Sequence, residues 1–504
     1  MGQELGWILV ATIATTGSCA LAATRYVDQS STNPAAPYTN WVTAAHTIQE
    51  AVDVSLSGDE IVVTDGIYAT GERTFQSHGN NRLVIDKPIT VRSVNGPAVT
   101  ILSAKTEGWP LRGVYLVDGA VLSGFSVCNG SVPDSPYGGG IYAASATAVI
   151  TNCTVFNNVG GERGGGVRGG TLYDCTLRDN VAFLGGGAEN CVLNRCILTA
   201  NNAEEEGGGA MGSVLNQCTL SGNVALWGGG AGDCTLNNCV LFSNSATGSN
   251  SSGGGAVCST LNNCVVVGNS AADYGGGVGM GPCPSTLNNC IIYFNAAPSG
   301  ANFTPQDVLN YCCTTPLPTN GHGNITAEPK FVDQLHNDFH LQASSPCINT
   351  GNNALVFTQV DADGKPRIVG GTVDIDAYEY QTPVSQASYA WLQQFDLPLL
   401  SSTDKADTDE DGMNNWQEWV CGTIPTNAQS VLKLSGSECV STGVKISWPS
   451  VLNRSYVVER CTNLTVAPFA PVSDSLVGTS ETLSFTDTNR ADAGACVYRL
   501  KVQQ

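Results

Sequence analysis

The sequence predicts an all-β protein: a right-handed parallel β-helix (solenoid), followed by a short calcium-loop linker and a small β-sandwich. Three observations support this prediction. A sequence motif recurs from Gly138 to Cys313: Asn-Cys, a short apolar run, Asn and then Gly-Gly-Gly. The acidic segment from Asp407 to Glu418 has the residue spacing of a cation-binding loop. Residues 431–504 alternate between apolar and polar side chains, as strands do.

The repeat has a nearly constant period, which is typical of a solenoid whose units stack on one another. Its cysteines lie 21 to 26 residues apart, at Cys153, Cys175, Cys196, Cys218, Cys239, Cys264, Cys290 and Cys312. The first seven each have an asparagine five positions on, at Asn158, Asn180, Asn201, Asn223, Asn244, Asn269 and Asn295. Glycine triplets start at Gly138, Gly164, Gly185, Gly207, Gly228, Gly253 and Gly275.

One unit, residues 234–255, indicates how a coil forms. Two apolar pairs, Cys234 with Leu236 and Cys239 with Leu241, alternate inward on either side of an Asn-Asn turn. A third short strand is expected after the glycine triplet. Three short strands without a helix describe one coil, which buries its apolar face only against neighbouring coils. Equivalent residues then lie about 4.8 Å apart, so we expect the stacked asparagine amides to form a hydrogen-bonded ladder.

The stacked cysteines admit three interpretations. The first is a column of small buried thiols that fills a narrow interior. The second is disulfides between coils, because a step of about 4.8 Å lies within the Cα range that a disulfide accepts. The third is metal binding, although companion pairs such as Cys258/Cys264 and Cys283/Cys290 lack the usual spacing and have no histidine nearby.

Composition and the first residues indicate the compartment and the class of partner. Among 504 residues only 13% are charged, yet the net charge is −21, which argues against nucleic acid as a partner. Residues 1–22 read as a secretory signal ending in Ala20-Leu21-Ala22, although Glu4 makes its start atypical. Twenty cysteines fit an oxidising compartment. We expect a secreted or cell-surface protein that meets a membrane only through an unidentified anchor; its oligomeric state stays open.

The remaining segments follow in order along the chain. We expect an N-terminal cap with a short helix at 24–57, coils at 58–303, the last coils and a C-terminal cap at 304–382, a helix and calcium-loop linker at 383–430, and the sandwich at 431–504. Near and within the sandwich, Cys421, Cys439, Cys461 and Cys496 allow three pairings, of which Cys461–Cys496 is our first choice.

The acidic segment satisfies the pattern of an EF-hand loop, in which oxygen atoms surround a hard cation. The expected calcium ligands are Asp407, Asp409, Asp411, the carbonyl of Met413, Asn415 (through water) and a bidentate Glu418. Gly412 permits the sharp turn. A solvated acidic linker is the alternative. We expect the ion to order the linker rather than to act as a signal.

Several stretches resemble secreted bacterial β-helix proteins of the pectin-lyase-like superfamily with choice-of-anchor architectures. They are Gly58–Tyr68, Asn324–Val332, Ser345–Gly351, Asp361–Arg367 and Val373–Glu379. Asp407–Glu418 with the following Gly422–Asn427 resembles thrombospondin type 3 or dockerin-like calcium linkers, in which Asp is usual where Ile424 stands. The last domain resembles fibronectin type III-like modules. This resemblance implies the architecture and not an activity, because one fold hosts many functions.

Charged side chains give little support for catalysis on the coils. Neither Lys nor His occurs from Gly138 to Gly300, which removes histidine-based triads and most general bases. Glycoside hydrolysis needs paired carboxylates. We expect no catalytic site; the only candidates are a mixed-charge patch of Asp174, Arg178, Asp179 and Arg195, and the alternative is a solvated face of weak ion pairs.

A second outward set precedes the glycine triplets and is expected to share one edge of the solenoid. Its members are Arg163, Leu184, Glu206, Trp227, Ser252 and Tyr274. Trp227 and Tyr274 offer flat faces to sugar rings, so Arg163, Glu206, Trp227 and Tyr274 are our candidates for ligand binding. The alternative is that they only cover a turn.

These observations favour a non-catalytic protein whose β-helix displays a surface for glycan or protein binding. The expected partner is a polysaccharide or another surface protein. The alternative is a polysaccharide lyase or glycoside hydrolase acting on an acidic polysaccharide, and a third possibility is a purely structural envelope layer.

Overall fold

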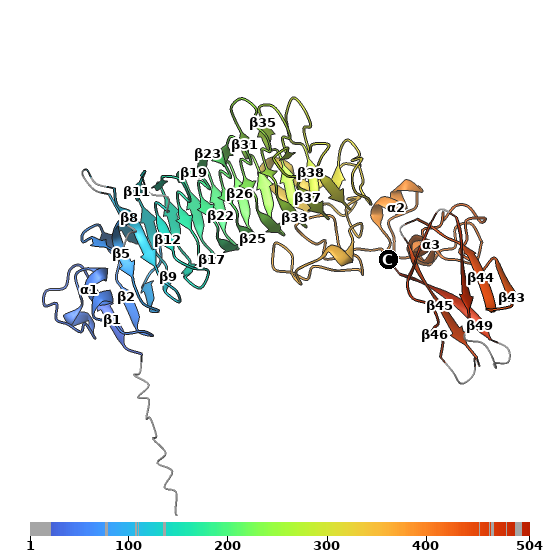
Figure 1. The fold of residues 1–504 in the computed structure, drawn as a ribbon, viewed down its shortest axis with the longest axis horizontal. Helices are drawn as coiled ribbons and strands as arrows, with labels where there is room; N and C mark the ends of the chain where they lie inside the picture. The colour runs from blue at the N-terminus through green and yellow to red at the C-terminus, as the bar shows by residue number, and fades with distance from the viewer. Residues whose placement is uncertain are drawn as a thin grey trace, which may run out of the picture.

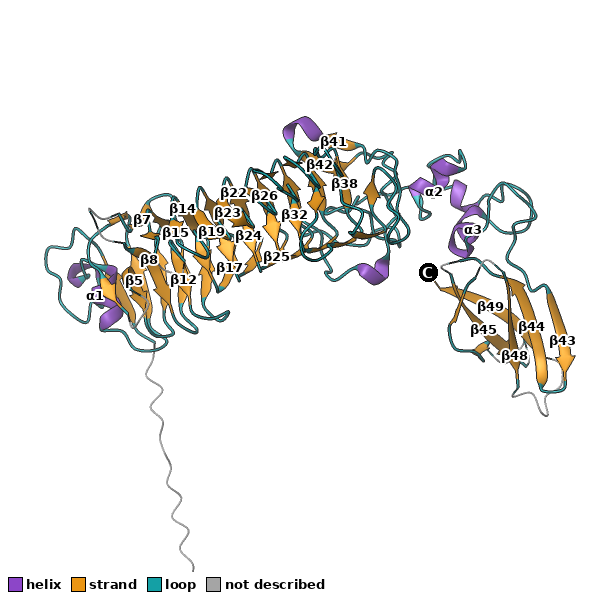
Figure 2. Cartoon of the chain, turned by 45° about the horizontal axis from the view of Figure 1, so that its top comes forward, coloured by secondary structure: helices purple, strands orange, loops and turns teal. Residues whose placement is uncertain are grey.

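The computed structural model describes residues 22–75, 79–105, 108, 110–134, 138–452, 454–462, 464, 468–479, 481–488 and 496–503. The predicted secretory signal at 1–22 therefore lies, apart from its last residue, outside the described residues. The predicted fold class is confirmed: parallel strands stack into a β-helix, and small antiparallel sheets follow beyond its C-terminal end (Figure 1). Helices lie only at the N-terminal end and after the coils in the described part of the chain (Figure 2).

Four sheets run along the β-helix; three of them extend over most of its length, whereas the fourth, sheet D, spans only the coils between Ser131 and Ala271. Sheet A contains β1 (Thr24–Val27), β2 (Glu60–Val63), β6 (Thr90–Ser93), β9 (Val121–Ser123), β13 (Val149–Thr151), β17 (Thr171–Tyr173), β21 (Val192–Asn194), β25 (Val214–Asn216), β29 (Thr235–Asn237), β33 (Thr260–Asn262), β37 (Thr286–Asn288) and β39 (Val308–Asn310). Sheet B contains β3 (Gly66–Tyr68), β7 (Thr100–Ser103), β10 (Ser126–Cys128), β14 (Thr154–Phe156), β18 (Thr176–Arg178), β22 (Ile197–Thr199), β26 (Thr219–Ser221), β30 (Val240–Phe242), β34 (Val265–Val267), β38 (Ile291–Tyr293) and β40 (Cys313–Thr314).

The other two sheets flank the glycine triplets. Sheet C contains β4 (Arg73–Thr74), β5 (Asn80–Ile85), β8 (Arg112–Leu116), β12 (Ile141–Ala143), β16 (Val167–Arg168), β20 (Ala188–Glu189), β24 (Ala210–Met211), β28 (Ala231–Gly232), β32 (Ala256–Val257) and β36 (Val278–Gly279). Sheet D contains β11 (Ser131–Val132), β15 (Val159–Gly160), β19 (Val181–Leu184), β23 (Asn202–Glu206), β27 (Val224–Ala225), β31 (Ser245–Ala246) and β35 (Ser270–Ala271). The expectation of three strands in a coil was therefore wrong: sheet D adds a fourth, whose strands are mostly of two residues and show no alternation.

The asparagine ladder predicted from the repeat is confirmed. Each side-chain amide of Asn158, Asn180, Asn201, Asn223, Asn244 and Asn269 donates to the amide oxygen of the asparagine in the next coil, at 2.9–3.0 Å. Asn295 donates in the same way to Asn302, which ends the ladder. All eight side chains are buried. Each amide also donates to a carbonyl of the preceding coil, as Asn223 does to Leu198 at 2.9 Å.

The cysteine column is also buried, and its eight members are free thiols. Backbone N–H groups donate to the sulfur of the next coil, as Cys196 does to Cys218 at 3.4 Å. Of the three interpretations, the structure therefore supports stacked thiols that fill the interior. The register of the strands does not fit the predicted pairing Cys461–Cys496, because Cys461 lies opposite Val497 and successive side chains of a strand point to opposite faces.

The N-terminal cap is built as expected around a short helix. Helix α1 (Ile48–Asp53) begins at a capping box of Thr47 and Glu50 and buries Ile48, Ala51 and Val52 against the first coils. Strand β1 already pairs with β2 in sheet A, so the cap continues directly into the solenoid.

The segment after the coils differs from a simple continuation of the stack. Sheets A and B end at β39 and β40, and β41 (Phe331–Asp333) pairs antiparallel with β42 (Asp338–Leu341). Phe331, Phe339 and Leu341 pack against Val265 and Ile291 on the outer face of sheet B, together with other buried apolar residues of both parts. Residues 331–389 therefore cover the side of the last coils as well as their end.

Short helices and the sandwich complete the chain. The helices are α2 (Tyr389–Gln394) and α3 (Asn415–Cys421), with 3₁₀ turns at Trp41–Thr43, Gln334–His336, Asn353–Leu355 and Thr403–Lys405. In the described part of the chain, no helix has the length and apolar character needed to cross a bilayer. The sandwich strands are β43 (Gly436–Val440), β44 (Gly443–Pro449), β45 (Ser455–Cys461), β46 (Ala470–Pro471), β47 (Leu476–Val477), β48 (Thr482–Asp487) and β49 (Val497–Gln503). Trp448, Tyr456 and Ile446 form their common core.

Candidate functional site

The residues before the glycine triplets form one column along the β-helix, as their register predicted. Bridges join Arg163 to Leu184, Glu206 to Trp227, Trp227 to Ser252, and Ser252 to Tyr274, while β19 and β23 pair Leu184 with Glu206. We call these six residues the edge column. Trp227 and Tyr274 therefore lie two coils apart, a separation of about 10 Å along the axis.

The aromatic members of the edge column are accessible. Tyr274 is 38% exposed, and the half-buried Trp227 donates its indole N–H to the carbonyl of Asn250 at 2.9 Å. That hydrogen bond satisfies the polar atom of the indole and fixes its ring. Two partly exposed aromatic side chains thus lie in the column, with Ser252 between them.

Arg163, the N-terminal member of the edge column, is bound by a buried carboxylate, that of Glu189. Glu189 accepts hydrogen bonds from Arg163 at 3.2 Å and from Arg168 at 2.7 Å, and its side chain is only 7% exposed. The Arg168 guanidinium also lies 5.6 Å from the ring centroid of Tyr142. This arrangement orients Arg163, whose guanidinium also lies 3.6 Å from a carboxylate oxygen of Glu162.

Glu206 has a different environment. Its side chain lies over Gly232, because a Cβ atom there would come within 2.6 Å of the Glu206 Oε1. Burial, and then the charges of Asp233 and Glu205, raise the pKa of Glu206 to about 7. Near neutral pH this carboxyl therefore exists in both protonation states and can donate or accept a hydrogen bond.

The four candidates for catalysis form two separate exposed ion pairs. Arg195 binds Asp174 through two hydrogen bonds of 2.8 and 2.7 Å, and both side chains are 51% exposed. Arg178 binds Asp179 at 2.7 Å and stacks 4.2 Å from the ring centroid of Phe156. Each charge is thus neutralised by its own partner on an open surface, which suits a solvated face.

The acidic loop brings its carboxylates together. Oxygen atoms of Asp407, Asp409 and Asp411 all lie within 4.8 Å of one another. Backbone N–H groups of Asp411 and Gly412 donate to the two oxygens of Asp407, and that of Met413 donates to Asp411 at 2.8 Å. These bonds close the loop over its own carboxylates.

Three buried oxygens of this loop have no hydrogen-bond partner in the described structure: Oδ2 of Asp409, Oδ2 of Asp411 and Oε2 of Glu418. Glu418 is fully buried in α3, and burial together with the charges of Asp409 and Asp411 raises its pKa to about 7. A hard cation satisfies such oxygens, so the donor set fits calcium.

Two of the expected calcium ligands, Asn415 and Met413, lie at the end of the acidic loop, where α3 begins. Asn415 is buried at the start of α3, where its amide donates to the Thr403 carbonyl and its oxygen accepts from the Thr408 hydroxyl, each at 2.9 Å. Its side chain is therefore already engaged within the linker. Met413 follows the turn at Gly412, whose φ is +98° and which only glycine adopts readily.

A cavity of about 180 Å³ lies where the last coil, the cap, the linker and the sandwich meet. Tyr311, Thr350, Ser388, Trp419 and Arg454 are among its lining residues. Among the described residues that line it there is no carboxylate and no histidine, so it lacks the acid and base pair of a hydrolase.

Sequence reasoning missed two groups beside the edge column. Glu189 and Tyr142 stand on the outer face of sheet C, each one coil from Arg163 on either side of it, and only the register of these short strands places them there. Asp233, Cys258 and Cys283 also come together on this side of the β-helix. Their signal in the sequence was weak, because these cysteines stand outside the main period.

Comparisons with known proteins find only weak structural likeness. No family model matches the chain, and a search of curated proteins finds no match. Among solved structures, the pectate lyase Pel9A is 15% identical with a TM-score of 0.44, and the match covers 71% of this chain and 97% of that one. A rhamnogalacturonan lyase is 13% identical with a TM-score of 0.34, covering 62% of this chain and 91% of that chain. An alginate lyase from Paenibacillus sp. str. FPU-7 is 12% identical with a TM-score of 0.30, covering 52% and 95%. At these values the likeness says nothing of what this chain binds or catalyses.

Proposed function

We propose that this chain is a secreted or cell-surface β-helix protein that binds a polysaccharide along its edge column without cleaving it. The observation that carries the proposal is the continuous register of Arg163, Glu206, Trp227 and Tyr274 across successive coils. A row of groups along the axis suits an extended chain lying on the solenoid.

The chemistry of the column favours a neutral or weakly charged glycan. Trp227 and Tyr274 supply ring faces about 10 Å apart, on which sugar rings stack through their C–H faces. Arg163 supplies donors that Glu189 orients, and Glu206 supplies a carboxyl that exchanges hydrogen bonds with hydroxyl groups. Rigid aromatic anchors with few rotatable bonds lose little conformational entropy on binding.

A polysaccharide lyase or glycoside hydrolase is the second candidate, and one observation favours it. Glu206, with its raised pKa, has Asp233 as a neighbouring charge, and a protonated acid beside a second carboxylate is the chemistry of glycoside hydrolysis. The exposed pairs Asp174–Arg195 and Arg178–Asp179 add no support, since each is neutralised internally.

We also propose that calcium binds Asp407, Asp409, Asp411 and Glu418, with the Met413 carbonyl as a further ligand. The unpartnered buried oxygens of Asp409, Asp411 and Glu418 support the proposal. The ion would fix the loop that precedes α3, and hence the joint between the β-helix and the sandwich. Its function would be structural, since these ligands all lie in one short linker segment.

One screen separates the two candidate functions. The full chain is incubated with neutral and acidic polysaccharides, and both retained binding and the release of unsaturated or reducing sugar are scored. Binding without product is expected. Product release that disappears in Glu206→Gln would establish the enzyme and overturn the proposal, whereas absence of both binding and product would remove glycan recognition altogether.

A further inference from the structure

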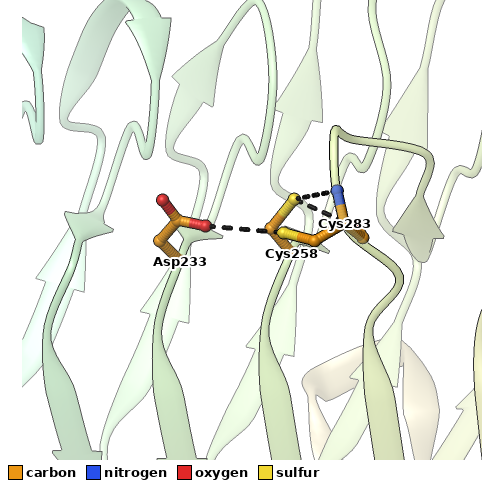
Figure 3. Close-up of side chains that lie close together, drawn as sticks. All are labelled: Asp233, Cys258 and Cys283. Atoms are coloured by element: carbon orange, nitrogen blue, oxygen red, sulfur yellow. Dashed lines mark hydrogen bonds between the residues drawn. The ribbon is translucent and has the colours of Figure 1, made fainter.

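The surface beside the edge column carries a cluster of one carboxylate and two thiols. Asp233 follows β28, Cys258 follows β32, and Cys283 lies in the loop after β36, so three successive coils each contribute one side chain. Their ligand atoms all lie within 4.8 Å of one another (Figure 3). Asp233 and Cys283 are exposed and Cys258 is half-buried, so the cluster opens to solvent.

The backbone is arranged to bring the three groups together. Asp233 and Cys258 occupy the same corner of their coils, each with a φ of +49°, and the Asp233 N–H donates to Val257 in the next coil. The loop after β36 then passes close over Cys258. Gly281 permits this approach, because a Cβ there would lie 2.5 Å from the Cys258 sulfur.

The two sulfurs have different orientations. The Cys258 sulfur accepts the Cys283 N–H at 3.3 Å and lies 3.2 Å from the Cys283 carbonyl oxygen, so it faces the backbone of the loop. The Cys283 sulfur points back along the axis and lies 4.0 Å from Oδ1 of Asp233 (Figure 3). The three ligand atoms thus lie within 4.8 Å of one another, and both cysteines are free thiols.

Every charged residue in the sequence from Cys196 to Gly300, which includes the cluster, is acidic. Asp233 lies next to Glu206, whose pKa it helps to raise, and Lys and His do not occur between Gly138 and Gly300. A bound divalent cation would supply the positive charge that neutralises Asp233 and favours the thiolate form of the two cysteines.

We propose that Asp233, Cys258 and Cys283 bind a thiophilic divalent cation of the zinc class, with one coordination position open to solvent. Two thiolates and one carboxylate are ligands that zinc accepts, and tetrahedral bonds of about 2.3 Å to sulfur and about 2.1 Å to oxygen separate neighbouring ligand atoms by less than 4 Å. The present separations need only small side-chain rotations to reach such a geometry. The site would join the last coils and lies apart from the calcium loop, whose ligands are all oxygens.

The test uses the full chain, purified under reducing conditions, stripped of metal and titrated with Co²⁺ and then Zn²⁺. Co²⁺ bound to thiolates gives a charge-transfer absorption that oxygen ligands do not give, so the calcium loop does not interfere. We expect this band in the wild type, its displacement by Zn²⁺, and its loss with one metal ion fewer per chain in Cys258→Ser and in Cys283→Ser. Asp233→Asn, which tolerates the same backbone conformation, should weaken the band without abolishing it.

Cys439→Ser is the matched control, because Cys439 is also exposed but lies in the sandwich; it should keep the band. Three results would overturn the proposal. They are no charge-transfer band in the wild type, a band that persists in Cys258→Ser and Cys283→Ser, or a Cys258–Cys283 disulfide found by mass spectrometry in exported protein purified without reductant.

Discussion

The buried asparagine ladder gives a prediction whose size follows from its hydrogen bonds. Asn223→Ala removes four of them: two that its amide donates, to Leu198 and to Asn244, and two that its oxygen accepts from the backbone and side chain of Asn201. The backbone N–H of Asn201 loses its hydrogen bond to the Asn223 oxygen, at a cost of about 1–3 kcal/mol. The side-chain amide of Asn201, the carbonyl of Leu198 and the side-chain oxygen of Asn244 each lose one hydrogen bond, at about 0.5–1 kcal/mol apiece. The expected loss in the free energy of unfolding is about 2.5–6 kcal/mol.

A second, part-exposed ladder supplies the control. In sheet A, Asn216 donates to Asn194 at 3.0 Å and accepts from Asn237 at 2.9 Å, but water reaches these groups. Asn216→Ala should therefore cost at most about 1 kcal/mol. Guanidinium unfolding followed by far-UV circular dichroism compares the two variants. Equal midpoints for Asn223→Ala and Asn216→Ala would refute the reasoning that burial of the ladder stabilises the coils.

Three further predictions concern the linker and the surface. Chelation of calcium should make residues 404–420 sensitive to protease while the coils stay intact, because the loop carboxylates then repel one another; unchanged cleavage would count against the site. The pKa of Glu418 is raised from 4.5 to about 7 in the ion-free fold, so its contribution to stability is present at low pH and is lost as the pH rises through about 7. Calcium binding near pH 6 should then release about one proton, which calorimetry in buffers of different ionisation enthalpy detects and Glu418→Gln abolishes. The double variant Asp174→Ala/Arg195→Ala should change the free energy of unfolding by less than about 1 kcal/mol, since both side chains are half-exposed, and a larger loss in thermal or denaturant unfolding would contradict this.

Much of the solenoid could be predicted because its repeat is dictated by stacking. Inward residues such as Cys239 and Leu241 recur at fixed positions, and buried asparagines need partners in the neighbouring coil, so period alone gave the register. The same register correctly placed Arg163 and Tyr274 on one edge. Helix α1 was predictable from its three buried residues and its capping box.

Other features could not be predicted, because they leave no clear pattern in the local sequence. Strands of sheet D such as β31 bury a single side chain, so they show no alternation. The cover over sheet B depends on contacts far apart in sequence. At the covered outward position the local sequence shows only an unbroken apolar run of Val240, Val265 and Ile291, after the mixed series Thr176, Ile197 and Thr219. The cluster around Cys283 depends on a loop insertion whose path the repeat does not determine.

Binding of a glycan by the edge column is the central claim, and Trp227 tests it most directly. Affinity electrophoresis in gels containing each polysaccharide compares the wild type with Trp227→Ala and with Tyr173→Ala, whose ring is 37% exposed on sheet A, away from the column. We expect at least one polysaccharide to retard the wild type and Tyr173→Ala alike. Trp227→Ala should bind the same polysaccharide at least about tenfold more weakly. Equal retardation of Trp227→Ala and the wild type would contradict the account.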